Sequence, residues 1–189
     1  MTDFTAHTLQ TAPEASQPLL EKSQKAFGRI PGLHAVMAES PQHLEGYQVL
    51  HHLFTQTAFD ATEQTIVWQT INVEHECHYC VPAHTAIAKR TKVADDVIEA
   101  LRNETPLPDA KHEALRTFTL QVVRQRGNVT DEQAQTFFDA GYDRRAVLDV
   151  VLATAQKVMS NYVNHIAQTP IDEVVKPFAW EKAGKPQAA

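Results

Sequence analysis

Residues 74–84 read Glu-His-Glu-Cys-His-Tyr-Cys-Val-Pro-Ala-His and contain the only two cysteines of the chain, Cys77 and Cys80. Pro82 lacks an N–H, so a helix tolerates it only in the first turn, where that donor has no partner. Residues 83–89 favour a helix, which must therefore begin at or just before the proline. The stretch predicts that Cys80 lies in or just before the first turn and that Cys77 directly precedes it.

A helix start is a setting that makes a cysteine reactive. Its unpaired N–H groups and the positive end of its dipole stabilise an anion. Helix N-termini and Cys-x-x-Cys motifs both lower a thiol pKa from about 8.5 to roughly 3.5–7.5. His84 follows Cys80 by one turn on the same face and can exchange a proton with it, directly or through a water. Because cysteines this close can also form a disulfide, the motif combines a nucleophile, a resolving partner and a base.

Two other interpretations of the stretch stay open. The cysteines can be buried small residues beside a packed histidine. Alternatively, Cys77, Cys80 and His84 can bind zinc together with His75 or His78. Structural zinc sites usually join two separated ligand pairs, whereas all candidates here are local. Redox chemistry of the two thiols is therefore the favoured hypothesis.

Helical patterns occupy almost all of the remaining sequence. Helix starts are expected where a capping side chain precedes such a pattern, at Ser40-Pro41, Asp60–Glu63 and Thr130–Gln133. Another helix is expected from about Asp109 to Arg126, with Gly127 as its stop. No stretch alternates with the two-residue period of a half-buried strand. The sequence therefore predicts an all-α protein of eight or nine helices.

The longest apolar pattern lies in the last third of the chain and predicts the buried face of a long helix. Its members recur at three and four residues: Val147, Val150, Val151, Ala155, Val158, Tyr162 and Ile166. We expect a single domain over residues 15–180, a loosely ordered segment at 1–14 and a flexible tail at 181–189. Residues 177–180, Pro-Phe-Ala-Trp, are expected to lie outside any helix and to pack on the core, or else on another subunit.

Composition excludes several classes of function. The chain has 189 residues and a net charge of -6, which argues against nucleic acid or anionic membrane as a partner. No run approaches the roughly 18 apolar residues of a membrane helix, and no secretory leader is recognisable. The six glycines stand alone, so a phosphate-binding loop is not expected. These features predict a cytoplasmic protein whose chemistry needs no nucleotide.

The stretch from Cys77 to His84, with the preceding helix-forming residues 62–73, resembles the alkylhydroperoxidase D and carboxymuconolactone decarboxylase superfamily. Weaker similarity extends from about Phe27 to Trp180. The resemblance implies an all-helical bundle of two related halves that assembles as a dimer, trimer or hexamer. It also implies reduction of hydroperoxides, in which Cys80 attacks and becomes a sulfenic acid, Cys77 donates a proton and then forms the disulfide, and His84 belongs to the proton relay.

The chain departs from that family at two positions. Tyr79 stands where the best-known peroxidases have a histidine before the second cysteine, and Thr65 stands where they have a relay glutamate. Side chains that could replace the relay are a set of acidic residues and a histidine near the motif: Glu63, Glu74, Glu76 and His78. Glu63 is more simply a helix cap, and the others are more often solvated.

The favoured function is a thiol-dependent peroxidase that acts on organic hydroperoxides or hydrogen peroxide without a bound cofactor. An external dithiol reductant, a thioredoxin-like or lipoyl-bearing protein, is expected to regenerate the thiols. The alternatives are a general thiol–disulfide oxidoreductase or redox sensor, a carboxymuconolactone decarboxylase, and a zinc-bearing interaction protein. His51, His52 and His75 are candidates for the wall of the pocket, and Trp68 and Phe54 for its apolar lining or the core.

Overall fold

A computed structural model describes residues 4–182. This part of the chain contains no strand, and it forms nine α-helices and two short 3₁₀ helices, as the sequence predicts. The α-helices are α1 (Gln17–Phe27), α2 (Gly32–Met37), α3 (Pro41–Phe54), α4 (Ala61–Glu74), α5 (Cys80–Arg90), α6 (Asp95–Arg102), α7 (Ala110–Arg124), α8 (Asp131–Asp139) and α9 (Arg144–Ala167). The 3₁₀ helices are η1 (Glu14–Ser16) and η2 (Glu173–Phe178).

The predicted helix starts are confirmed by their capping hydrogen bonds. The Ser40 side chain accepts from the N–H of His43 at the start of α3. Asp60 and Glu63 form a reciprocal capping box at the start of α4, and Thr130 and Gln133 form another at α8. Each contact joins residues three apart, so it depends on local sequence alone.

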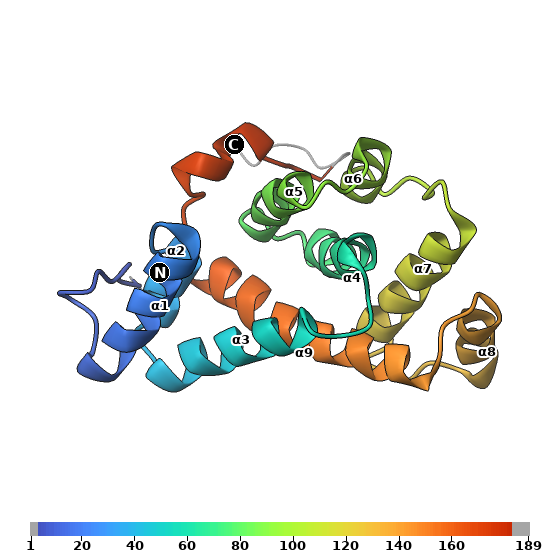
Figure 1. The fold of residues 1–189 in the computed structure, drawn as a ribbon, viewed down its shortest axis with the longest axis horizontal. Helices are drawn as coiled ribbons and strands as arrows, with labels where there is room; N and C mark the ends of the chain where they lie inside the picture. Colours follow the sequence, from blue (N-terminus) through green and yellow to red (C-terminus); the bar gives the residue numbers. More distant parts are fainter. Residues whose placement is uncertain (1–3, 183–189) are drawn as a thin grey trace.

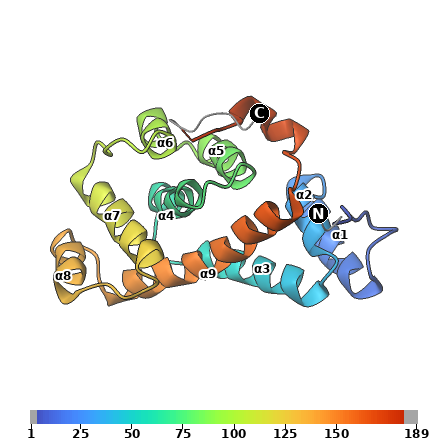
Figure 2. The same cartoon turned by 180° about the vertical axis from the view of Figure 1, so that it is seen from behind.

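The helices are arranged around α4 and α9 (Figure 1). Figures 1 and 2 show α3 running alongside the long helix α9, whereas α5 and α6 lie on the other side of α4. One hydrophobic core lies between α4, α6, α7, α8 and the first half of α9. A second core joins α1, α2 and α3 to the turn between α4 and α5, and it includes both cysteines. The cysteines therefore lie in the second core, at the turn that connects it to α4 and α5.

The predicted buried face of α9 is wrong. Val150 is buried, but Val151, Tyr162 and Ile166 are 48%, 51% and 63% exposed. The second half of α9 instead buries a row of mostly polar side chains: Gln156, Lys157, Ser160, Asn161 and Asn164. These polar groups are stable in the interior because side chains of α4 and α5 pair with them, and a hydrophobicity pattern does not contain those partners.

The two ends of the described chain contact the helices. His7 donates its backbone N–H to the carbonyl of Ala35, and Ala12 is buried. Pro177 and Phe178 belong to η2, so the prediction that residues 177–180 lie outside any helix is wrong in part. The indole N–H of Trp180 donates to the carbonyl of Arg102 at 2.8 Å, as expected for packing on the core. Parts of the two predicted terminal segments, residues 1–3 and 183–189, lie outside the described residues.

Within residues 4–182, none of the helices combines the length and the apolar character that crossing a bilayer requires.

Candidate active site

The turn between α4 and α5 holds the two cysteines. Glu76 adopts a left-handed φ of 53°, which reverses the chain after α4, and the N–H of Cys77 donates to the carbonyl of Asn72 at 2.9 Å. Cys80 is the first residue of α5, and its N–H donates to the Sγ of Cys77 at 3.3 Å. Pro82 lies in the first turn, where a missing N–H costs nothing. The predicted position of both cysteines relative to the helix is confirmed.

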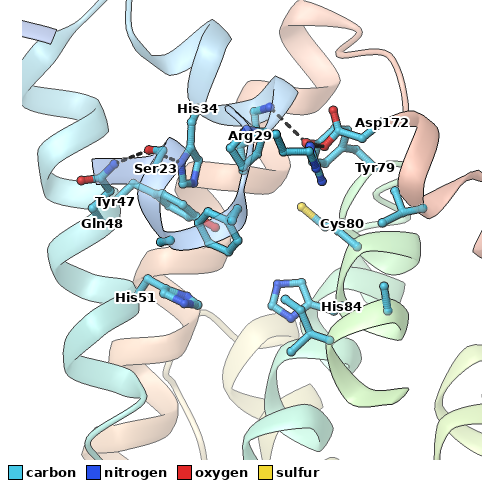
Figure 3. A pocket seen from close by; sticks show the side chains of 18 of the residues that line it. Ser23, Arg29, His34, Tyr47, Gln48, His51, Tyr79, Cys80, His84 and Asp172 are labelled. Carbon is cyan, nitrogen blue, oxygen red and sulfur yellow. Dashed lines mark hydrogen bonds and ion pairs between the residues drawn. The ribbon is translucent and has the colours of Figure 1, made fainter. Parts of the chain in front are cut away.

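Cys80 lines a cavity of about 940 Å³, whereas Cys77 lies behind it. In Figure 3 the sulfur of Cys80 points into the cavity, with His84 on the same helix and with Tyr47 and His51 on the facing helix α3. The side chains of Cys77 and Cys80 are both almost completely buried, and both are reduced. A substrate in the cavity would therefore meet the sulfur of Cys80 and not that of Cys77.

Polar side chains of α9 surround the Cys80 sulfur. The Nδ2 of Asn164 donates to the Sγ of Cys80 at 3.3 Å and lies 3.9 Å from that of Cys77. Burial by itself would raise the pKa of Cys80, but a hydrogen bond from the Cys77 thiol and the charge of Lys157 outweigh it. With further hydrogen bonds from α9, they lower the pKa of Cys80 to about 5. Cys80 is therefore a thiolate at neutral pH.

The two thiols have pKa values shifted in opposite directions. The hydrogen bond to Cys80 and burial both raise the pKa of Cys77, and the negative charge of the Cys80 thiolate raises it further. One sulfur of the pair is thus ionised and the other carries the shared proton. A nucleophile must be ionised and a neighbouring proton donor must be protonated, and the two sulfurs meet these two requirements.

His84 lies beside Lys157 within the cavity wall. The Nζ of Lys157 is 2.9 Å from the Nε2 of His84, and the imidazole contacts the Trp68 ring at a centroid distance of 5.0 Å. Burial and the Lys157 charge hold the pKa of His84 well below its usual value. The neutral imidazole therefore accepts from the ammonium through Nε2 and carries its own proton on Nδ1. His84 and Lys157 thus form a hydrogen-bonded pair in the wall of the cavity.

Tyr79 links the dithiol turn to the C-terminal segment. Its hydroxyl donates to Asp172 at 2.7 Å and accepts from the N–H of Leu33 at 3.1 Å. Asp172 also binds the guanidinium of Arg29 at 2.6 Å and the N–H of Gly32 at 3.0 Å. Tyr79 thus forms a structural contact that joins three segments at the cavity wall.

Each of the other predicted relay residues contacts a partner other than the sulfurs. Glu63 caps α4 and accepts from the Tyr142 hydroxyl at 3.0 Å. Glu74 forms an ion pair with Arg124 at 2.7 Å, and the Nε2 of His78 lies 3.1 Å from the carbonyl of Thr169. Glu76 lies 3.9 Å from Lys182. Among the residues that the structure describes, no carboxylate other than Asp172 lines the cavity.

The candidate zinc ligands face different partners. His84 contacts Lys157, and the Nδ1 of His75 lies 2.9 Å from the side-chain oxygen of Asn161. Of the histidines considered for the pocket wall, His51 and His52 line it and His75 does not. Trp68 and Phe54 pack in the first core. Within the described part of the chain, no three His, Cys, Asp or Glu side chains are grouped as a metal site.

Comparison with known proteins shows the fold. No family model and no curated protein matches the sequence. A peroxidase-related protein from Ralstonia eutropha, described as an alkylhydroperoxidase AhpD core, superposes with a TM-score of 0.77 at 18% identity over 93% of this chain and 96% of its own. The chain has the AhpD fold. A peroxidase-related protein from a Silicibacter species gives a TM-score of 0.76, also at 18% identity, over 93% of this chain and 96% of its own.

The AhpD fold also occurs in an enzyme of another activity. The debrominase Bmp8, in complex with 2,3,4-tribromopyrrole, superposes with a TM-score of 0.77 at 16% identity over 94% of this chain and 95% of its own. At these identities the likeness establishes the architecture, and the chemistry must be argued from the site.

Sequence reasoning missed three residues of the AhpD-fold site, Lys157, Asn164 and Asp172. A signal for the first two is present, because a lysine and several amides recur at three- and four-residue spacing within an otherwise apolar helix. The spacing of these polar residues, taken without the apolar residues of the same helix, predicts a buried polar face. No comparable local signal marks Asp172, whose partners lie far away in the sequence.

The buried histidines of the cavity wall predict a loss of stability in mild acid. Burial lowers the pKa of His34 from 6.5 to about 4, so this side chain stays neutral in the fold but is protonated in the unfolded chain between these values. The contribution of His34 to the free energy of unfolding is therefore fully present above pH 6.5. It is lost as the pH falls towards 4, at roughly 1.4 kcal/mol per pH unit.

We expect His34→Gln to reduce the stability difference between pH 7 and pH 5 by about 2 kcal/mol. Urea unfolding at the two pH values measures it, and exposed His52→Gln serves as the control variant. An identical pH dependence in His34→Gln and the wild-type protein would contradict a neutral buried imidazole.

Proposed function

We propose that the protein is a thiol-dependent peroxidase that reduces organic hydroperoxides with Cys80 and Cys77. The observation that supports this most directly is the asymmetry of the pair. Cys80 is ionised and faces the cavity, and Cys77 is protonated, buried and within reach of it. A thiolate next to a thiol that both donates a proton and forms the disulfide is what two-electron reduction of an O–O bond requires.

In the first step the Cys80 thiolate attacks the terminal oxygen of the hydroperoxide. The S–O bond forms, the O–O bond breaks, and the departing alkoxide takes the proton of Cys77 to give the alcohol. Cys80 is then a sulfenic acid and Cys77 a thiolate. The nearby ammonium of Lys157 stabilises the negative charge throughout, because its side chain is fully buried and no solvent screens it.

In the second step the Cys77 thiolate attacks the sulfur of the sulfenic acid. The S–S bond forms, the S–O bond breaks, and the hydroxide leaves as water after it takes a proton supplied through Lys157 and His84. An external dithiol protein then reduces the disulfide and becomes oxidised itself. This reductant, the homo-oligomer and the cytoplasmic location stay predictions.

The size of the cavity favours organic substrates over hydrogen peroxide. Its volume of about 940 Å³ lies within the usual range for drug-sized ligands. Apolar and aromatic side chains from five segments line it, including Phe27, Leu33, Tyr47, Ile87 and Val174. Such walls bind hydrocarbon, which hydrogen peroxide lacks.

Reductive dehalogenation is a second candidate, favoured by the likeness to the debrominase Bmp8. The electron balance is the same, because an aryl halide and two thiols give the arene, the disulfide and hydrogen halide. The aromatic rings of Tyr47 and Phe27 in the cavity wall suit a flat ring as well as an alkyl group.

The test supplies the purified protein with dihydrolipoamide and either cumene hydroperoxide or 2,3,4-tribromopyrrole. We expect the alcohol to form in a ratio of one to each disulfide. Release of bromide without consumption of peroxide would favour the dehalogenase. A disulfide that cycles while neither substrate is consumed would contradict both and favour a redox sensor.

A further inference from the structure

Besides Arg29 and Lys157, two further cations line the cavity. Lys22 extends from α1 and Arg90 from the last turn of α5, and both line the cavity. Both side chains are exposed, and neither makes an ion pair or a side-chain hydrogen bond with another of the described residues. Their charges are therefore available to a ligand.

The neighbouring cations of the cavity already have partners. Arg29 is paired with Asp172, the only carboxylate among the described lining residues, and buried Lys157 contacts His84 beside the Cys80 thiolate. The chain as a whole has a net charge of -6, so an excess of positive charge in this cavity is a local feature. Complementarity of charge selects an anion for this region.

The face of α5 sets the distance between the reactive sulfur and this anion site. Five of the α5 residues that line the cavity wall follow one another at intervals of one or three residues: Cys80, Ala83, His84, Ile87 and Arg90. Ten residues of α-helix separate the backbones of Cys80 and Arg90, a rise of about 15 Å. The side chains between the two ends include apolar Ala83 and Ile87, and Phe27 of α1 also lines the cavity. The cavity thus has a reactive end, an apolar middle and a cationic end.

We propose that the cavity binds amphiphilic hydroperoxides with an anionic head group, the carboxylate of a long-chain acid being the simplest. The head group lies between Lys22 and Arg90, the chain follows the apolar face of α5, and the hydroperoxide reaches Cys80. The hydroperoxide end rests on the proposed function. The preference for an anionic amphiphile does not, because it depends only on the cavity and its charges.

Binding of unreactive probes tests the preference without any turnover. Isothermal titration with the full-length reduced protein compares dodecanoate with 1-dodecanol, each below its micelle concentration. We expect dodecanoate to bind roughly fivefold more tightly, the effect of two exposed charge contacts. High salt should remove the difference, because it screens charges at the rim of the cavity.

A pair of variants with matched charge changes identifies the site. Lys22→Gln/Arg90→Gln is expected to abolish the preference for dodecanoate. Lys25→Gln/Lys89→Gln removes the same number of charges from the same two helices and is expected to retain the preference. Neither control residue lines the cavity, and Lys89 pairs with Asp95 at 2.7 Å.

The outcomes separate this inference from the proposed function. Equal binding of the two probes, no binding of either, or a preference that survives in Lys22→Gln/Arg90→Gln would overturn the anion site, whatever the protein does with cumene hydroperoxide. A preference that depends on Lys22 and Arg90 in a protein that consumes no hydroperoxide would support the site and contradict the peroxidase. If both hold, kcat/KM for a fatty-acid hydroperoxide relative to its methyl ester should fall in the Lys22→Gln/Arg90→Gln variant.

Discussion

Cys80→Ser is expected to abolish the consumption of hydroperoxide, because it replaces the only ionised sulfur that faces the cavity. A serine hydroxyl is not ionised at neutral pH and does not form the disulfide with Cys77. The measurement is loss of cumene hydroperoxide in the presence of dihydrolipoamide, with circular dichroism to verify that the helices are retained. Full activity in Cys80→Ser would contradict the assignment of the nucleophile.

Cys77→Ser distinguishes the two sulfurs. This variant retains the Cys80 thiolate and loses its resolving partner, so we expect it to consume about one equivalent of peroxide and then to stop. The product is a sulfenic acid at Cys80, which dimedone traps and mass spectrometry locates. A dimedone adduct at Cys77 in the Cys80→Ser protein, with none at Cys80 in Cys77→Ser, would reverse the assignment.

Lys157→Met is expected to raise the pKa of Cys80, because it removes the buried positive charge beside the thiolate. Methionine has a similar length and no charge. The loss of reactivity should be greatest in mild acid, where the sulfur of the variant is protonated to a larger extent than that of the wild-type protein. We expect more than about tenfold slower alkylation by iodoacetamide there.

The pH dependence of the alkylation rate is the decisive measurement for Lys157, because two effects oppose each other at neutral pH. A thiolate of higher pKa is intrinsically more nucleophilic, which offsets part of the smaller ionised fraction. The midpoint of the alkylation profile should therefore move upward from its wild-type value even if the rate at pH 7 changes little. A midpoint that stays in place would contradict the role assigned to the ammonium.

Stability gives a second readout on Lys157 that a purely structural residue would not share. Removal of one partner from a buried charge pair leaves the other charge uncompensated and is strongly destabilising. We expect the melting temperature of Lys157→Met to fall at neutral pH, where the Cys80 thiolate loses its buried counter-charge, and to fall less in mild acid, where the thiol is protonated. Lys176→Met, on the exposed side of η2, serves as the control and should alter the melting temperature at neither pH.

Much of the local structure could be predicted because its causes lie close together in the sequence. Ser40, Asp60 and Thr130 cap helices through side chains and N–H groups three residues apart. The position of Cys80 at the start of α5 follows from Pro82, which no later turn of a helix accommodates. Local hydrogen bonding and backbone sterics need no knowledge of the rest of the molecule.

The orientation of α9 could not be predicted from its apolar residues. Val151, Tyr162 and Ile166 fit a buried stripe by their spacing but are exposed, whereas Lys157 and Asn164 are fully buried. A lysine becomes stable in the interior only when partners such as His84 and the Cys80 thiolate lie beside it. Those partners come from another helix, so the pattern within α9 contains no record of them.

By itself, the sequence determined that the chain is helical and that a pair of sulfurs stands at a helix entrance with an imidazole one turn away, because these features depend on neighbours within a few residues. Only the tertiary structure decided which sulfur is ionised and which faces a ligand. Besides the neighbouring Cys77 thiol, the charge of Lys157 and the hydrogen bond from Asn164 act on Cys80, and the fold brings both across from α9. Electrostatic interactions depend on distance in space, and the sequence does not specify that distance.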